Sequence, residues 1–127
     1  NFIGHVARAE LPNWYRQADI FCFPTLCDTY GVGLLEAMSS SCAVIASQAG
    51  GAGEIVTPAT GMTINLTNPE RYVQDYAAAL IELASNGERR AQLGAAARRH
   101  ILAHHDWEKI GARLREFYDA LPVPSRR

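Results

Sequence analysis

The feature that most constrains the fold is an abrupt change of side-chain periodicity between residues 20 and 40. Residues 20–24 (IFCFP) form a short apolar run, and the proline at its end cannot continue a hydrogen-bonded ladder. In the run GLLEAMSS that follows, Leu34, Ala37 and Met38 recur at helical spacing, which predicts a helix from about residue 30 to residue 40. The segment DTYGVGLLE (residues 28–36) therefore joins the carboxyl end of a strand to the amino end of a helix, where α/β sheets bind ligands.

Three other short runs have the composition of strands. Residues 43–47 (AVIAS) are almost continuously apolar, which is typical of a parallel strand covered on both faces. Residues 2–6 (FIGHV) predict a short buried strand, and residues 61–66 (GMTINL) predict a weaker one. About four strands alternating with helices indicate the α/β class, with a doubly wound, Rossmann-like parallel sheet followed by helices.

Start signals in the sequence place the remaining helices. A proline is tolerated in the first turn because its missing amide is not needed there, and asparagine or aspartate caps that turn. With the break at residues 86–87, these signals predict helices over residues 12–18, 68–85, 88–103 and 106–121. We therefore expect one partial domain over residues 1–121 and a frayed tail at residues 122–127.

The composition fits a folded domain and excludes some partners. The chain has 127 residues, of which 48% are apolar, enough for a substantial core. Its 12 basic and 13 acidic residues are interspersed, so nucleic acid is not an expected partner. The number of cysteines is odd, namely Cys22, Cys27 and Cys42, which favours buried thiols in a reducing compartment over a disulfide framework, and hence a cytoplasmic protein. No run reaches the roughly 18 apolar residues of a membrane helix.

Two carboxylates flank the expected helix start, with two glycines between them. Glu36 is two residues, or about 200°, round the helix from Leu34, so it should point away from the core, and Gly33 should leave a bare patch beside it. A helix start presents unpaired amides and about half a positive charge, which suits a diphosphate. A carboxylate about one turn further along matches a vicinal diol. The rival interpretation of Asp28 and Glu36 is a helix cap plus a solvated face.

The segment DTYGVGLLEAM belongs to an ordered series with ELPNWYRQADIFCFPTL upstream and VIASQAGGAGEIV and GMTI downstream. This series closely resembles the carboxyl-terminal, donor-binding half of retaining, nucleotide-sugar-dependent glycosyltransferases of the GT-B fold, of the family 4 or group 1 type. The likeness runs from FIGHV to HHDWEKIG, nearly the whole chain. It implies a hexosyltransferase-like enzyme that transfers a sugar to a hydroxyl acceptor with retention of configuration.

The resemblance also implies roles for particular residues. Glu36 would accept hydrogen bonds from the ribose hydroxyls of the donor, and Asp28 would contact the donor sugar; both are the expected catalytic-site residues. The backbone amides of Tyr30, Gly31 and Val32 would hold the phosphate. The amides of Gly50 and Gly51 either line the same pocket or belong to an ordinary turn. No metal or other cofactor is expected.

Two positions depart from the family pattern. Asp28 is one methylene shorter than the usual glutamate, so its reach is reduced. Ser41 and Ala43 replace a helix-ending glycine and a proline that are common in such enzymes. A serine in the left-handed conformation at this cap would cost about 1 kcal/mol relative to glycine.

By the same resemblance, FIGHV would be the third strand of its domain, and two further strands would precede residue 1. We therefore expect the chain alone to lack transferase activity and to expose strand edges. The implied partners are the nucleotide-sugar donor and an acceptor glycan, lipid or small molecule held by an amino-terminal domain. Peripheral membrane association of the full-length enzyme remains an option.

Several alternatives stay open at this stage. A sugar-nucleotide epimerase of the same fold, or a non-catalytic nucleotide-binding module, would show similar motifs. His100 and His104 lie four residues apart and could share a metal, but without a third ligand a solvated face is favoured. Tyr30 either stacks on the ligand or fills the mouth of the loop. The other large aromatic side chains are expected in the core or between domains, namely Trp14, Trp107 and Phe117.

Overall fold

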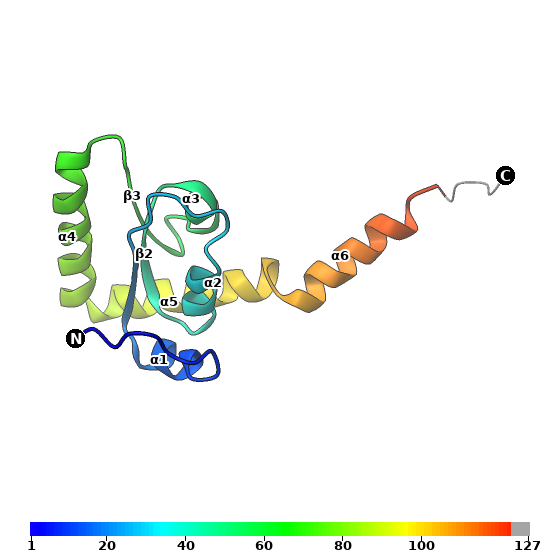
Figure 1. Ribbon diagram of the computed structural model, residues 1–127, viewed down its shortest axis with the longest axis horizontal. Helices are drawn as coiled ribbons and strands as arrows, with labels where there is room; N and C mark the ends of the chain where they lie inside the picture. The colour runs from blue at the N-terminus through cyan, green and yellow to red at the C-terminus, as the bar shows by residue number, and fades with distance from the viewer. Residues whose placement is uncertain (123–127) are drawn as a thin grey trace.

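The computed structural model describes residues 1–122 as a three-stranded sheet with six helices (Figure 1). All but one residue of the expected tail lie outside the described part. The strands are β1 (Ile20–Phe23), β2 (Ala43–Ser47) and β3 (Gly61–Ile64). The helices are α1 (Leu11–Gln17), α2 (Val32–Ser39), α3 (Gly50–Ile55), α4 (Pro69–Ser85), α5 (Gly87–His104) and α6 (Trp107–Asp119).

The sheet is parallel, with β2 in the middle and the order β1-β2-β3. In the register, Ile20 pairs with Ala43, and Val44 pairs with Gly61. All five residues of β2 are buried, as the absence of alternation in AVIAS predicts. The carboxyl ends of the strands meet at one edge of the sheet, so the loops after β1 and β2 lie next to each other.

Helices cover both faces of the sheet, which confirms the doubly wound α/β class. On one face, α2 and α3 pack against Val44 and Ala46 of the middle strand. On the other face, α4 packs against Ala43 and Ile45. Helix α5 joins both cores, since its Leu93 belongs to one cluster and its Ala97 to the other.

The helix starts and the turn before β2 agree with the local sequence signals. The side chain of Asn68 accepts hydrogen bonds from the amides of Glu70 and Arg71, both at 3.1 Å. Ser41 has a φ of 66°, which confirms that a serine occupies the left-handed turn after α2. Helix α5 packs so closely against this turn that a Cβ on Gly94 would clash with the Ser41 carbonyl.

The prediction of a buried strand at residues 2–6 is wrong. Residues 1–7 contain no strand, Phe2 and Ile3 are exposed, and the described sheet has three strands rather than about four. A strand needs a neighbour to satisfy its amides and carbonyls. Here β1 pairs only with β2 within the described residues, so its other edge is open and no strand reaches residues 2–6.

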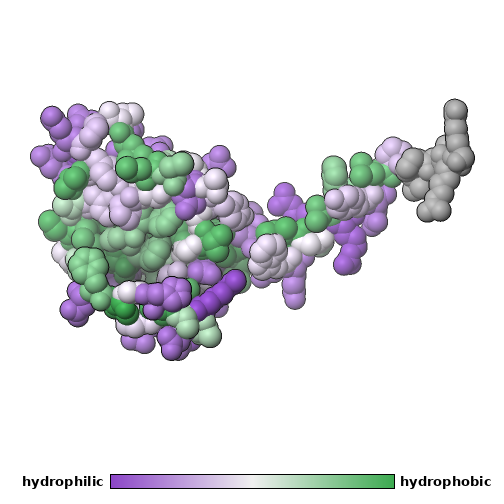
Figure 2. Space-filling model, in the orientation of Figure 1, coloured by the Kyte–Doolittle hydropathy of each residue, from purple (hydrophilic) through white to green (hydrophobic). Residues whose placement is uncertain are grey.

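Several apolar side chains are more exposed than expected. Cys42 is buried, but Cys22 and Cys27 are exposed. Of the two positions expected for Trp14, Trp107 and Phe117, the core is wrong, since all three lie outside it and none of the residues of α6 is buried; packing between domains stays a prediction. Helix α6 extends away from the body with hydrophobic side chains along it, as Figures 1 and 2 show. Across residues 1–122, every helix is too short or too polar to span a bilayer.

Candidate functional site

The candidate site lies where the loops after β1 and β2 come together at the carboxyl edge of the sheet. The amide of Gly51 donates a hydrogen bond to the Asp28 carbonyl at 3.3 Å. A Cβ on Gly50 would clash with that carbonyl, and one on Gly51 would lie only 2.7 Å from the Cα of Tyr30. Both glycines are therefore needed for the close approach of two backbone segments. Gly50 also has a positive φ of 49°.

The Asp28 carboxylate turns back onto its own loop. Its Oδ1 accepts hydrogen bonds from the amide of Tyr30, at 2.9 Å, and from the amide of Gly31. Gly31 then adopts a left-handed conformation, with φ of 72°, and α2 begins at Val32. Asp28 thus caps two of the three amides to which the resemblance assigns the donor phosphate. In the first turn of α2 the amide of Leu34 donates to the Gly31 carbonyl at 2.9 Å, so the further amides that this helix start can offer are those of Val32 and Gly33.

Glu36 is half-buried on α2, and its carboxylate is held by one neighbour. The Tyr15 hydroxyl donates to Oε2 of Glu36 at 3.1 Å. Burial of the Tyr15 phenol, together with the negative charge of Glu36, raises the pKa of Tyr15 to about 12. The surface that Gly33 leaves bare faces the same tyrosine, since a Cβ there would meet the Tyr15 hydroxyl at 3.5 Å and the Phe21 ring at 4.0 Å.

Asp28 and Glu36 line separate hollows rather than one cleft, and Glu36 also lines a smaller one, of about 170 Å³, beside Tyr15. The Asp28 hollow, of about 530 Å³, is also lined by Gly50 and Gly51. The Glu36 hollow, of about 330 Å³, extends over Val32 to the junction of α5 and α6. Both hollows include Tyr30 and His105, so these two side chains stand between the carboxylates.

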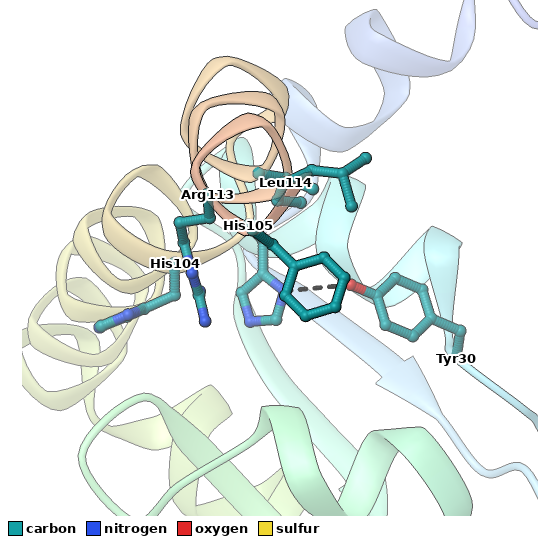
Figure 3. A pocket seen from close by; sticks show the side chains of 7 residues that line it. Tyr30, His104, His105, Arg113 and Leu114 are labelled. Carbon is teal, nitrogen blue, oxygen red and sulfur yellow. Dashed lines mark hydrogen bonds between the residues drawn. The ribbon is translucent and has the colours of Figure 1, made fainter. Parts of the chain in front are cut away.

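His105 is the site residue that sequence reasoning missed. Its Nδ1 lies 3.3 Å from the Tyr30 hydroxyl, within hydrogen-bonding distance (Figure 3). Burial, and then the neighbouring His100 and His104, lower the pKa of His105 below its ordinary value. No local signal could have found this pair, because 75 residues separate its members. Among residues 1–122, no three or more His, Cys, Asp or Glu side chains are grouped as a metal site would require.

A parallel sheet covered on both faces, with a glycine-lined junction at its carboxyl edge, defines a Rossmann-like domain of the ligand-binding α/β class. Comparison with known protein families identifies the family within this class to which the chain belongs. The model of the family "Glycosyl transferases group 1" matches residues 1–100, and the chain belongs to this family. Its structural neighbours are glycosyltransferases of the GT-B fold, so the expected family and fold class are confirmed.

Individual relatives agree with this assignment. The GDP-mannose-dependent monoacylated alpha-(1-6)-phosphatidylinositol monomannoside mannosyltransferase of Corynebacterium glutamicum is 37% identical over 95% of the chain and 32% of its own length. The C-terminal domain of a group 1 family protein from Francisella tularensis superposes with a TM-score of 0.72 at 30% identity, covering 83% of this chain and 53% of that one. Anabaena HepE, solved with UDP, gives a TM-score of 0.74 at 20% identity, covering 90% and 31%. The chain thus spans between about a quarter and a third of the length of the curated relatives that it matches.

Proposed function

We propose that this chain is the donor-binding part of a retaining glycosyltransferase that uses a nucleotide-diphosphate sugar. The observation that carries the proposal is the junction at residues 28–36, in which the half-buried Glu36 lies about one turn inside a helix whose first residue, Val32, lines the same hollow. Two relatives support it: the C. glutamicum enzyme is named as GDP-mannose-dependent, and HepE was solved with UDP. Since the chain is about a third of such enzymes, sugar transfer would require the rest of the protein.

In this proposal the start of α2 holds the donor phosphates. Its free amides and its partial positive charge favour an anion. The amides of Tyr30 and Gly31 are already engaged by Asp28, so a phosphate that uses them must displace that carboxylate. Once displaced, Asp28 is free to turn toward the hydroxyls of the sugar. Donor binding would thus replace one negatively charged acceptor at these amides, the Asp28 carboxylate, with another, the phosphate.

Glu36 would bind the ribose of the nucleotide. Tyr15 engages one of its oxygens, and a carboxylate has acceptor sites on both oxygens. The same hydrogen bond fixes the direction of the side chain before the donor arrives, which reduces the entropy lost on binding. The Glu36 hollow, which opens beside Val32, gives the nucleotide room next to this carboxylate.

The proposed share of this domain in catalysis is positioning and electrostatic stabilisation. Amides at the start of α2 would stabilise the charge that develops on the departing nucleoside diphosphate, and the proposal requires no metal ion for this. The acceptor hydroxyl would be presented from outside this chain. We place the reaction in the cytoplasm, because Cys22, Cys27 and Cys42 are all free thiols, as in a reducing compartment.

Calorimetric titration of GDP and of UDP into the intact protein tests the proposal. For whichever of the two nucleotides binds, replacement of Glu36 with alanine should lower the affinity by about tenfold or more, because hydrogen bonds to a charged group contribute about 1.5–3 kcal/mol. Glu70→Ala, which removes an exposed carboxylate from the first turn of α4, is the control and should leave the affinity unchanged. Equal affinities of wild type and Glu36→Ala would contradict the assignment of Glu36.

A further inference from the structure

His105 is the cap residue that directly follows α5, at the point where three hollows meet. As the cap of that helix, it donates its backbone amide to the Ile101 carbonyl at 2.8 Å, which fixes its place relative to the core. Its side chain lines the Asp28 hollow, the Glu36 hollow and a third, of about 600 Å³, that Arg113 and Leu114 of α6 border (Figure 3). Tyr30 also lines all three.

Tyr30 itself comes from a loop with little burial of its own. Tyr30 is 47% exposed, and its backbone amide is held by the Asp28 carboxylate. The proposed donor would have to displace that carboxylate, so the loop would lose this restraint in the donor-bound state, in which its amides must be held in place. The backbone of the loop would keep its close packing against Gly51, while the Tyr30 side chain is held to the folded body by His105, through a hydrogen bond at 3.3 Å and an edge-on ring contact with centroids 6.4 Å apart.

We propose that His105 is a positioning residue that holds Tyr30 and thereby fixes the backbone amides of residues 30–32 at the start of α2. The consequence for donor binding rests on the proposed function, whereas the restraint on the loop does not. His105 acts from the end of a helix that is anchored in the core, since Ile101, one turn earlier, is buried there. The restraint therefore connects the loop to the centre of the domain.

The surroundings of His105 favour a neutral ring that can hold the phenol. His100 lies beside it, with ring centroids 5.6 Å apart, and the pKa of His105 is lowered by burial and by its histidine neighbours. A neutral imidazole has one nitrogen that accepts and one that donates, and a tyrosine hydroxyl can do either. Asparagine can place a side-chain oxygen or nitrogen near the position of Nδ1, so His105→Asn should conserve the bond.

A double-mutant cycle in the intact protein tests the proposal, with GDP and UDP titrated separately as probes. His105→Ala and Tyr30→Phe should each weaken binding by about fivefold, the contribution of one hydrogen bond of about 1 kcal/mol. The double variant should be no weaker than either single variant, because both changes remove the same bond. His105→Asn should retain most of the affinity, and Arg99→Ala, which removes an exposed side chain of α5 away from the three hollows, should bind as wild type does.

Hydrogen exchange supplies a second measurement that needs no ligand. In His105→Ala the amides of residues 30–32 should exchange faster, while β2 and the core of α5 keep their wild-type rates. Three results would each overturn the positioning role. They are wild-type exchange rates at residues 30–32 in His105→Ala, additive losses of affinity in the double variant, and a loss of affinity in His105→Asn as large as that in His105→Ala. If neither nucleotide binds the wild-type protein, the donor proposal fails, and the exchange rates at residues 30–32 alone decide the role of His105.

Discussion

Replacement of Ser41 with glycine should stabilise the protein by about 1 kcal/mol. Ser41 is exposed and has a φ of 66°, in the left-handed region that disfavours any side chain. The turn cannot relax, because α5 packs against the Ser41 carbonyl at Gly94. Relief of the left-handed strain contributes about 1–2 kcal/mol, and the greater freedom of glycine in the unfolded chain offsets about 0.4–1 kcal/mol of this.

Thermal and urea unfolding of the 127-residue chain measure this effect. A gain of about 1 kcal/mol corresponds to a rise in Tm of about 4 °C for a domain of this size. Ser40→Gly is the matched control: Ser40 is the preceding residue, with φ of −91°, so glycine relieves nothing there and should destabilise slightly. The reasoning is refuted if Ser41→Gly is no more stable than wild type, or if both glycine variants gain equally.

Three further predictions concern the site and its supports. Gly51→Ala should destabilise the protein by about 1–3 kcal/mol, because the new Cβ would lie 2.7 Å from the Cα of Tyr30. Gly53→Ala, whose Cβ would have its nearest contact at 3.4 Å, should be tolerated, and urea unfolding of the two variants measures the difference. The pKa of Tyr15 is raised to about 12, so the stability that depends on its neutral phenol is fully present below pH 10 and is lost as pH rises through about 12. Tyr15→Phe should remove this part of the alkaline loss, as unfolding between pH 9 and 12 would show, and an unchanged pH profile would contradict the raised pKa of Tyr15, which burial and then Glu36 cause. Asn68→Ala should cost about 1 kcal/mol of unfolding free energy, measured by urea denaturation, because it removes the cap of α4.

The sequence predicted those parts of the fold that depend on near neighbours. The cap at Asn68 and the left-handed Ser41 involve bonds or dihedral angles within a few residues. The apolar run of β2 likewise predicts its own burial on both faces. The same holds for the junction at residues 28–36, where a change from strand to helix places two carboxylates near one helix start.

The tertiary structure decided which surfaces meet. Residues 2–6 have the composition of a strand but form none, because a ladder requires a second strand beside the first. The aspartate at position 28 is compatible with a ligand contact or a cap, and the loop geometry brings it to the amides of its own loop. The contact between Tyr30 and His105 arises only when α5 has packed across the core. Local preferences depend on bonds between sequence neighbours, whereas such contacts depend on the packing of residues far apart in the chain, which no local pattern records.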